Sequence, residues 1–276
     1  MENRLIFDVG MHRGEDTTYY LGKGYRVVAI DAGPDLINNA KTSLAKYIAH
    51  NQLILVHCAI SDSEGEVEFN ISKKTQWSSL KFLISDRKSL HHKRIKVQSK
   101  RLTSLVREFG LPYYCKIDIA GYDAICLKTL TDLKELPQFI SVESECVGEF
   151  ETLSDEQALE TLNQLYNLGY RKFKLVDQHN LTVLQPKIKF YHEPSMFIKF
   201  KRKAASIFRP REGIFILKCG HKFPSGSTGP FGDELEGNWL DYAIAQDTLL
   251  YHRKTYFELK SSYNHGFWCD WHAKLL

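Results

Sequence analysis

The chain has 276 residues, of which 43% are hydrophobic and 25% are charged, and its formal net charge is +4. This composition is ordinary for a globular protein, and the length allows a sizeable core in one large domain or two small ones. The weak, scattered positive charge does not indicate nucleic-acid binding, and no apolar run is long enough to span a bilayer.

The cysteines and the N-terminus both favour a cytoplasmic protein. The six cysteines are widely spaced, without a CxxC pair, and most of them lie in apolar segments. We therefore expect buried free thiols in a reducing compartment, and neither disulfides nor a zinc site. A strand is expected to begin within the first few residues, which leaves no space for a signal peptide.

Apolar and amphipathic segments alternate along most of the chain. Buried strands are expected at 4–9, 25–30, 53–60, 113–119 and 139–142, and helices at 14–21, 34–48, 102–109, 122–130 and 154–168. A short strand is expected at 66–70 as a hairpin partner, further strands at 95–99 and 170–176, a final strand at 213–218, and a last helix at 239–252. Ser154 and Gln157 occupy the positions of a capping box. The pattern predicts a single α/β domain, residues 1–276. Its central sheet is mostly parallel with helices on both faces, an antiparallel strand pair lies near the C-terminus, and ligands bind at the carboxyl ends of the strands.

The first strand ends in a glycine turn, and the second strand ends in an acid. Gly10 and Gly14 have the spacing G-x-x-x-G, which differs from the dinucleotide fingerprint and lacks the ending of a phosphate loop. A zwitterionic amino-acid tail fits better, with its ammonium facing backbone carbonyls or Asp8, although an ordinary βα turn would explain the glycines equally well. Asp31 is placed to bind both ribose hydroxyls, unless it is only an exposed cap before Pro34. Together these features predict a nucleoside ligand.

The end of the third strand is a weaker candidate for the same site. Cys58 is followed by the small residues Ala59 and Ser61, which leave space for an adenine. A plain strand end is equally consistent with this segment.

The fourth and fifth strands end in carboxylates. Asp118 is expected to orient an acceptor hydroxyl or to act as a base, and Lys116, on the same face of the strand, to pair with it. A purely structural Lys–Asp pair is the alternative. Glu143 is a second carboxylate within reach, or else a rim charge. His12 is the histidine retained as a catalytic candidate, and no spacing of His, Asp and Glu matches a metal site.

These segments resemble the FkbM-type methyltransferases, which depend on S-adenosylmethionine (SAM). The resemblance covers about residues 4–180 and is carried by DVGMHRGEDT (8–17), VAIDAGP (28–34), CAISDSEG (58–65), RLTSL (101–105) and KIDIAGY (116–122). In part of the family STGPFG (227–232) and Trp239 are similar to a C-terminal signature. The resemblance implies a Rossmann-like class I methyltransferase fold and methyl transfer from SAM to a hydroxyl, often on a sugar or natural product.

By position, the resemblance implies that Asp8, Gly10 and Gly14 line the methionine part of SAM and that Asp31 holds the ribose. The residues expected around SAM are Asp8, Gly10, Gly14, Thr17, Asp31, Ala32, Cys58, Ala59 and Lys116. Asp118 would stand next to the transferred methyl. The acceptor is expected to meet a loop at 72–93 and a C-terminal segment at 185–239, through Trp77, Ser78, Ser79, Ala120, Tyr122, Phe231 and Trp239.

The chain departs from the family pattern at two positions. Ala120 stands where the family has Glu, and Asp31 stands where it often has Glu. The first departure leaves two explanations open, a natural loss of the Glu and an inactivating substitution. The alternatives to O-methylation of a small-molecule or glycan acceptor are therefore an N-methyltransferase acting on a peptide or amine, and a silent SAM-binding interaction protein. An NAD-dependent enzyme is disfavoured by the glycine spacing. The oligomeric state stays open.

Overall fold

The computed structural model describes residues 4–71, 93–119, 121–144, 154–188, 214–216, 220–224, 227–258 and 267–276. The chain folds into two compact units. The first contains Met1–Glu143, Asn167–Gly169 and Leu275, and the second contains Ser144–Tyr166, Tyr170–Lys274 and Leu276. The single domain expected from the sequence stays a prediction.

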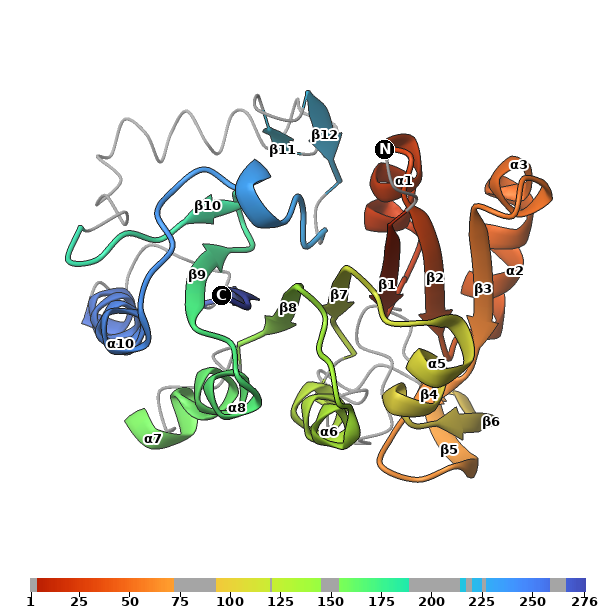
Figure 1. Cartoon of the computed structure of the whole chain (residues 1–276), viewed down its shortest axis with the longest axis horizontal. Coiled ribbons are helices and arrows are strands. Elements are labelled where there is room, and N and C mark those ends of the chain that lie inside the picture. The colour runs from red at the N-terminus through yellow and green to blue at the C-terminus, as the bar shows by residue number, and fades with distance from the viewer. Residues whose placement is uncertain are drawn as a thin grey trace. The chain divides into compact units, whose positions relative to one another are not determined.

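The first unit is built on five parallel strands (Figure 1). In spatial order they are β8 (Phe139–Glu143), β7 (Tyr114–Ile117), β1 (Leu5–Val9), β2 (Arg26–Asp31) and β3 (Leu53–His57). The helices between them are α1 (Glu15–Gly22), α2 (Pro34–Ser43), α3 (Ala45–Ala49), α5 (Leu102–Phe109) and α6 (Asp123–Thr129), which is followed by the 3-10 turn η2 (Leu130–Asp132). This arrangement confirms the predicted parallel α/β fold.

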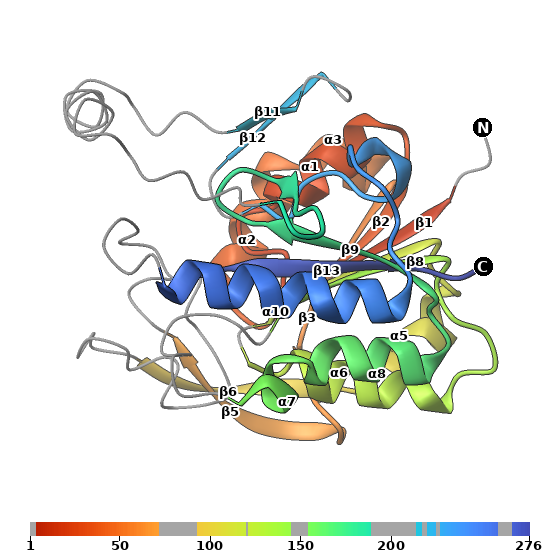
Figure 2. The same cartoon turned by 90° about the vertical axis from the view of Figure 1, so that its left-hand side faces the viewer.

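The order of the strands places β1 at a topological switch point. The chain runs outward from β1 through β2 to β3, and β7 and β8 lie on the other side of β1. Because βαβ crossovers are right-handed, the helices of the two halves cover opposite faces of the sheet. Figure 2 shows α1 and α2 on one side of these strands and α6 on the other. The carboxyl ends of β1 and β7 therefore meet where ligands bind in such folds.

The prediction of one strand at 53–60 is correct for its first half and wrong for its second half. β3 ends at His57, and the chain then leaves the sheet to form β4 (Ala59–Ile60), which pairs with β6 in a separate sheet. The N–H of Cys58 donates to the carbonyl oxygen of Asp31 at the point of departure (3.1 Å). The apolar run continues because Ala59 and Ile60 are buried in the second sheet. Likewise, the helix expected at 34–48 is interrupted at Leu44.

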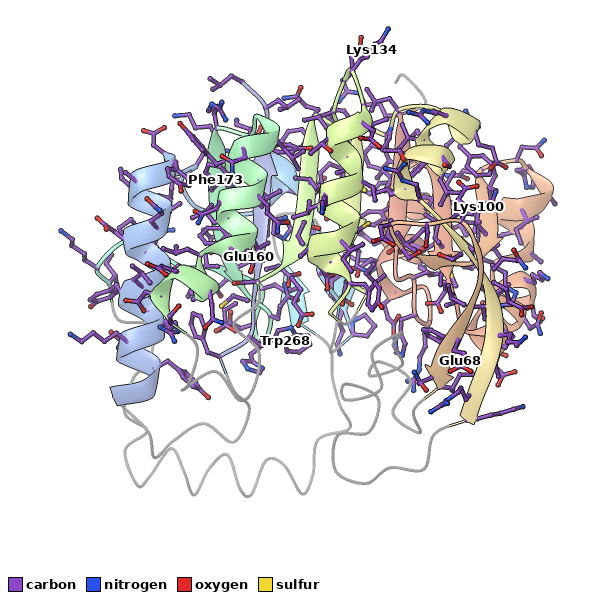
Figure 3. The ribbon with its side chains drawn as sticks, turned by 90° about the horizontal axis from the view of Figure 1, so that it is seen from below. Glu68, Lys100, Lys134, Glu160, Phe173 and Trp268 are labelled. Atoms are coloured by element: carbon purple, nitrogen blue, oxygen red, sulfur yellow. The ribbon has the colours of Figure 1, made fainter. Side chains whose placement is uncertain are left out.

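A three-stranded sheet contains β4, β6 (Lys93–Lys100) and β5 (Gly65–Ile71). Both strands expected at 66–70 and 95–99 are present, and they pair with each other in antiparallel register. Its apolar face packs on Ala32 and Ala59 through Phe69 and Val97. Its charged face carries cross-strand ion pairs, and Glu68 lies on this hairpin in Figure 3. The hairpin thus supports the residues that follow β2 and β3.

The second unit is built on antiparallel strands in the order β10 (Thr182–Val183), β9 (Lys172–Asp177) and β13 (Cys269–Lys274). Its other elements are α7 (Asp155–Ala158), α8 (Glu160–Leu168), β11 (Ile214–Ile216), β12 (His221–Phe223), η3 (Gly232–Glu234) and α10 (Tyr242–Glu258). The capping box of Ser154 and Gln157 is present, as expected. Phe173 of β9, labelled in Figure 3, packs edge-on against Trp271 of β13, with 6.4 Å between ring centroids.

Two expectations for the C-terminal part need correction. The strand at 213–218 is not the last one, because β12 and β13 follow it. The last helix begins later than expected and runs on to Glu258.

Cys58, Cys115, Cys126 and Cys269 are buried free thiols, as expected, and Cys146 and Cys219 lie outside the described residues. Across the described part of the chain, helices are either too short or too polar to cross a bilayer.

Candidate active site

The turn after β1 is held against β2 and β7 by its backbone. The N–H groups of Gly10 and Met11 both donate to the carbonyl oxygen of Ile30, at 3.0 Å. Gly10 has φ +84°, and a Cβ placed on it would lie 1.8 Å from the carbonyl oxygen of Asp118. The backbone of the chain therefore fills the space that a side chain at position 10 would need, and the contact of Gly10 with a cofactor stays a prediction. Glycine at position 10 brings the end of β7 against the turn.

Gly14 and His12 give the turn its shape. Gly14 precedes α1 with φ +80°, and its N–H donates to Met11 at 2.9 Å. A Cβ at Gly14 would make only an ordinary contact with Leu44, at 3.5 Å, so the backbone conformation is what favours glycine there. His12 adopts φ +54°, a left-handed conformation that is uncommon for residues other than glycine and that His, Asn and Asp adopt more often than most.

Asp31 ends β2 and faces the turn. Its Oδ1 accepts the N–H of Gly33 at 2.7 Å, and its Oδ2 accepts the N–H of His12 at 2.9 Å. A carboxylate has about four acceptor positions, so Asp31 keeps capacity for two further hydroxyl groups. Burial raises the pKa of Asp31, and the bonds from Gly33 and His12 offset only part of that rise.

Small and buried residues surround Asp31. Ala32, Cys58 and Ala59 are each less than a tenth exposed, and Nε2 of His57 lies 3.1 Å from the carbonyl oxygen of Ala32. Burial raises the pKa of Cys58 to about 12, so its thiol is neutral. This end of β2 and β3 therefore places small, uncharged side chains next to a carboxylate.

A buried ion pair supports the turn from beneath. Nζ of Lys116 lies 3.0 Å from Oδ1 of Asp8 and 2.9 Å from the carbonyl oxygen of Gly10, and Oδ2 of Asp16 is 3.8 Å away. Oγ1 of Thr17 donates to Oδ2 of Asp8 at 2.5 Å. Asp8 is fully buried and both of its oxygens are bonded, so it supports the turn and offers no exposed oxygen to a ligand's ammonium.

The prediction that Lys116 pairs with Asp118 is wrong, because its ion-pair partner is Asp8. Asp8 and Lys116 are register partners in the parallel β1–β7 pair, which brings their side chains together. Burial lowers the pKa of Lys116, but the charges of Asp8, Asp118 and Asp16 outweigh burial and raise this pKa well above its usual value. Lys116 therefore stays protonated and balances the neighbouring carboxylates.

Asp118 follows β7 at the same edge. Its N–H donates to the carbonyl oxygen of Val9 at 2.9 Å, which extends the β1–β7 pairing by one residue. Burial raises the pKa of the Asp118 carboxyl; the charge of Lys116 opposes this rise and that of Asp8 adds to it. Glu143 ends β8, whose Val142 pairs with Ile117, so both carboxylates lie at the carboxyl ends of neighbouring strands.

Sequence reasoning missed Asp123, the first residue of α6. It is 3% exposed, and its carboxylate accepts the N–H groups of Ile119 and Gly121, each at 3.0 Å. Burial, followed by the charge of Asp118, raises the pKa of Asp123 to about 6. An acid at a helix start after a glycine was the available signal, but it also fits an ordinary helix cap.

The remaining predicted residues lie in several places. Nδ1 of His12 is 3.3 Å from Oε1 of Glu15. Burial raises the pKa of Glu15, but the hydrogen bond with His12 and other interactions lower it, and the net shift is downward. Tyr122 is half-buried just before α6. Trp77, Ser78, Ser79 and Ala120 lie outside the described residues, as do most of 72–93 and much of 185–239. In the second unit Phe231 is buried, and Nε1 of Trp239 donates to Asp233 at 3.0 Å.

Carboxylates outnumber ammonium groups at this edge. Asp8, Asp16 and Asp118 act on the buried charge of Lys116, and Asp31 and Asp123 are further acids, at the end of β2 and after the loop that follows β7. Such a site favours a cation over a diphosphate. It therefore fits a ligand with a sulfonium and an ammonium group, and it disfavours a dinucleotide.

A family model described as the methyltransferase FkbM domain matches residues 8–172, more than half of the chain. The chain belongs to the FkbM methyltransferase family. It is a SAM-dependent methyltransferase, as the resemblance predicted. No curated protein matches the chain.

Solved structures give distant matches to this FkbM methyltransferase. A SAM-dependent methyltransferase from Geobacter sulfurreducens in complex with S-adenosyl-L-homocysteine is 11% identical, with a TM-score of 0.39 and coverage of 99% of this chain and 84% of the other. The C-terminal domain of precorrin-6Y C5,15-methyltransferase from Rhodobacter capsulatus is 14% identical, with a TM-score of 0.38 and coverage of 70% and 73%.

Proposed function

We propose that this chain transfers the methyl group of SAM to a hydroxyl group on a sugar, glycan or other natural-product acceptor. The observation that carries the proposal is the meeting of Asp118 with the turn after β1. The turn belongs to the cofactor site in the proposal, and Gly10 brings it against the backbone of Asp118. This contact supports the proposal, in which the Asp118 carboxylate stands beside the reacting methyl.

The cofactor would lie along the carboxyl ends of β1 and β2. Asp31 would accept the two ribose hydroxyls with the acceptor positions left by Gly33 and His12. The small residues Ala32 and Ala59, with Cys58, would border the adenine. The turn from Gly10 to Gly14 would carry the methionine part, with Asp8, Thr17 and Lys116 holding the turn in shape from below.

The chemistry requires alignment and a proton acceptor. SAM supplies an activated methyl group, so the chain must mainly hold the acceptor oxygen in line with it. A hydroxyl group also has to lose its proton as the new bond forms. Asp118 is our first choice for taking that proton at a carboxylate oxygen, and Glu143 and His12 are the second and third.

The surroundings of Asp118 suit this role. Burial moves the pKa of Asp118 upward, which makes its carboxylate a better base than an exposed one. Lys116 opposes that shift and so favours the ionised carboxylate, which is the form that accepts a proton. An amine acceptor would need less help from a base. Removal of the Asp118 carboxylate should therefore slow O-methylation more than N-methylation.

A mass-spectrometric methyl-transfer screen tests the proposal. Wild-type protein is incubated with SAM and a panel of glycosides, lipids and peptides, beside Asp118→Asn, Ala120→Glu and the control Asp241→Asn. Asp241 is exposed and pairs with Lys172, so its substitution tests a carboxylate remote from the turn. We expect a methylated hydroxyl, a loss of about 100-fold or more with Asp118→Asn, and no loss in the control.

Three results would contradict the proposal. Full activity of Asp118→Asn removes this residue as the base. Methylation of peptides or amines alone supports the N-methyltransferase. Absence of transfer by both the wild type and Ala120→Glu supports the silent SAM-binding protein.

A further inference from the structure

Asp123 binds the backbone of the loop that joins β7 to α6. Its Oδ1 accepts the N–H of Ile119 and its Oδ2 accepts the N–H of Gly121, both at 3.0 Å. The side chain is buried, and Gly121 adopts φ +87°, which allows the chain to turn back toward the helix. One carboxylate thus holds two amide groups of a short loop.

These bonds fix the peptide groups on both sides of Asp118. The N–H of Asp118 itself is bonded to the carbonyl oxygen of Val9 at 2.9 Å, and the following N–H, that of Ile119, is bonded to Asp123. A residue whose two flanking peptide planes are held has little freedom in φ and ψ. The direction in which the Asp118 side chain leaves the backbone is therefore set by β1 on one side and by Asp123 on the other.

We infer that Asp123 is a positioning residue for methyl transfer, which holds the loop after β7 so that the carboxylate of Asp118 is aimed at the acceptor hydroxyl. The inference rests on the proposed function, in which Asp118 takes the proton. Asp123 acts through the backbone, because its two hydrogen bonds go to the N–H groups of Ile119 and Gly121. The hydrogen bonds of Asp31 and of the turn come from other groups, so we expect the cofactor contacts to survive its loss.

The charge of Asp123 adds a measurable property to this role. Its pKa is raised to about 6, by burial first and by Asp118 second, while the N–H bonds from Ile119 and Gly121 lower it. Protonation replaces a charged acceptor by a weaker neutral one. The hold on the loop therefore weakens as the pH falls through about 6.

Amide hydrogen exchange followed by NMR tests the contact without an acceptor. In Asp123→Asn the amides of Ile119 and Gly121 are expected to exchange about tenfold faster or more, because an amide side chain offers one neutral acceptor in place of a carboxylate. The amides of β1 are expected to keep their rates. Asp132→Asn is the matched control, since Asp132 is exposed at the end of the same helical segment and pairs with Arg101. Unchanged rates for Ile119 and Gly121 in Asp123→Asn would overturn the inference.

Steady-state kinetics tests the functional part, with an acceptor taken from the methyl-transfer screen. Asp123→Asn should lower kcat about tenfold or more, keep the KM for SAM within about twofold, and remove the acid limb near pH 6 from the profile of kcat. Asp132→Asn should leave all three unchanged. An unchanged kcat, or a parallel loss of kcat and SAM binding, would overturn the inference.

A second variant covers the case in which Asp123→Asn does not fold. Gly121→Ala leaves the carboxylate in place but forces an alanine into φ +87°, so it displaces the same loop. It should also lower kcat and keep SAM binding, and full activity would count against the inference. If the proposed function itself is wrong, the wild type will bind no SAM or transfer no methyl group. If only this inference is wrong, the wild type will be active and the variants at Asp123 and Gly121 will match it.

Discussion

Lys116 in the first unit and Lys174 in the second are both almost fully buried, but their surroundings differ. Lys116 binds Asp8 and the carbonyl oxygen of Gly10, with Asp16 at 3.8 Å. Lys174 donates to the carbonyl oxygens of Gly232 and Leu235, at 3.1 and 2.7 Å, and lies 4.4 Å from the centroid of the Trp239 ring. Lys116 balances the charge of carboxylates, and Lys174 of β9 binds the backbone of the segment from Gly232 to Leu235.

The two buried charges therefore contribute differently to the stability of their units. Removing a charge that faces a buried carboxylate leaves that carboxylate uncompensated, which is among the largest single-residue penalties. Removing a charge that faces carbonyl oxygens and an aromatic ring loses charged hydrogen bonds and a cation–π contact, but leaves neutral groups behind. The first unit should therefore depend on its lysine more strongly than the second.

Lys116→Met is expected to have the largest effect. It should lower the free energy of unfolding by roughly 3–5 kcal/mol, because Asp8 is left buried with its charge unpaired. Urea denaturation of the variant measures this loss. The double variant Asp8→Asn with Lys116→Met should lose less than Lys116→Met alone, because the unpaired charge is gone. A loss below about 1 kcal/mol in Lys116→Met would show that Asp8 is not compensated by Lys116.

His272 should make the second unit sensitive to acid. It is fully buried, and burial followed by the charge of Lys174 lowers its pKa from 6.5 to about 3. Because the folded pKa is the lower one, the stability due to neutral His272 is present above about pH 6.5 and is lost as the pH falls toward 3. The loss at pH 4 should be roughly 3 kcal/mol.

Tryptophan fluorescence can follow this acid loss. Trp239, Trp268 and Trp271, three of the four tryptophans of the chain, belong to the second unit. His272→Phe should keep more of its stability between pH 7 and pH 4 than the wild type does. His50→Gln, at an exposed histidine of the first unit, should behave like the wild type. Equal acid sensitivity of His272→Phe and the wild type would exclude His272 as the cause.

Lys174→Met should have a smaller effect than Lys116→Met, a loss of about 1.5–3 kcal/mol, because the carbonyl oxygens of Gly232 and Leu235 lose a charged donor. Thermal unfolding is the measurement. Lys172→Met is the control on the same strand, since the exposed pair of Lys172 with Asp241 contributes about 1 kcal/mol or less. The comparison of the two units fails if Lys174→Met is as damaging as Lys116→Met.

Much of the first unit could be predicted because its signals are local. Buried parallel strands give continuous apolar runs, and the glycine turn and terminal acids mark where β1, β2 and β7 end. The partner of Lys116 could not be predicted, because it depends on the register between β1 and β7, two strands more than a hundred residues apart. Asp118 lies two positions away in the sequence, but Asp8 is the neighbour in space.

The last strand shows a different limit. In β13 the residues Cys269, Trp271 and Ala273 alternate with Asp270, His272 and Lys274. This period of two is typical of a strand with one solvent-exposed face. Here Asp270 and His272 are buried as well. Three polar residues in a segment of six made the strand hard to recognise. Asp123 was missed for a related reason, because its two backbone partners follow from the path of a loop.

Calorimetric titration with SAM tests whether the ends of β1 and β2 form a SAM site. Wild-type protein should bind SAM and not NAD, and Asp31→Asn should bind SAM about tenfold to a hundredfold more weakly, because a charged acceptor for the ribose hydroxyls is lost. Binding of NAD without binding of SAM, or equal SAM affinity in Asp31→Asn and the wild type, would contradict a SAM site at the ends of β1 and β2.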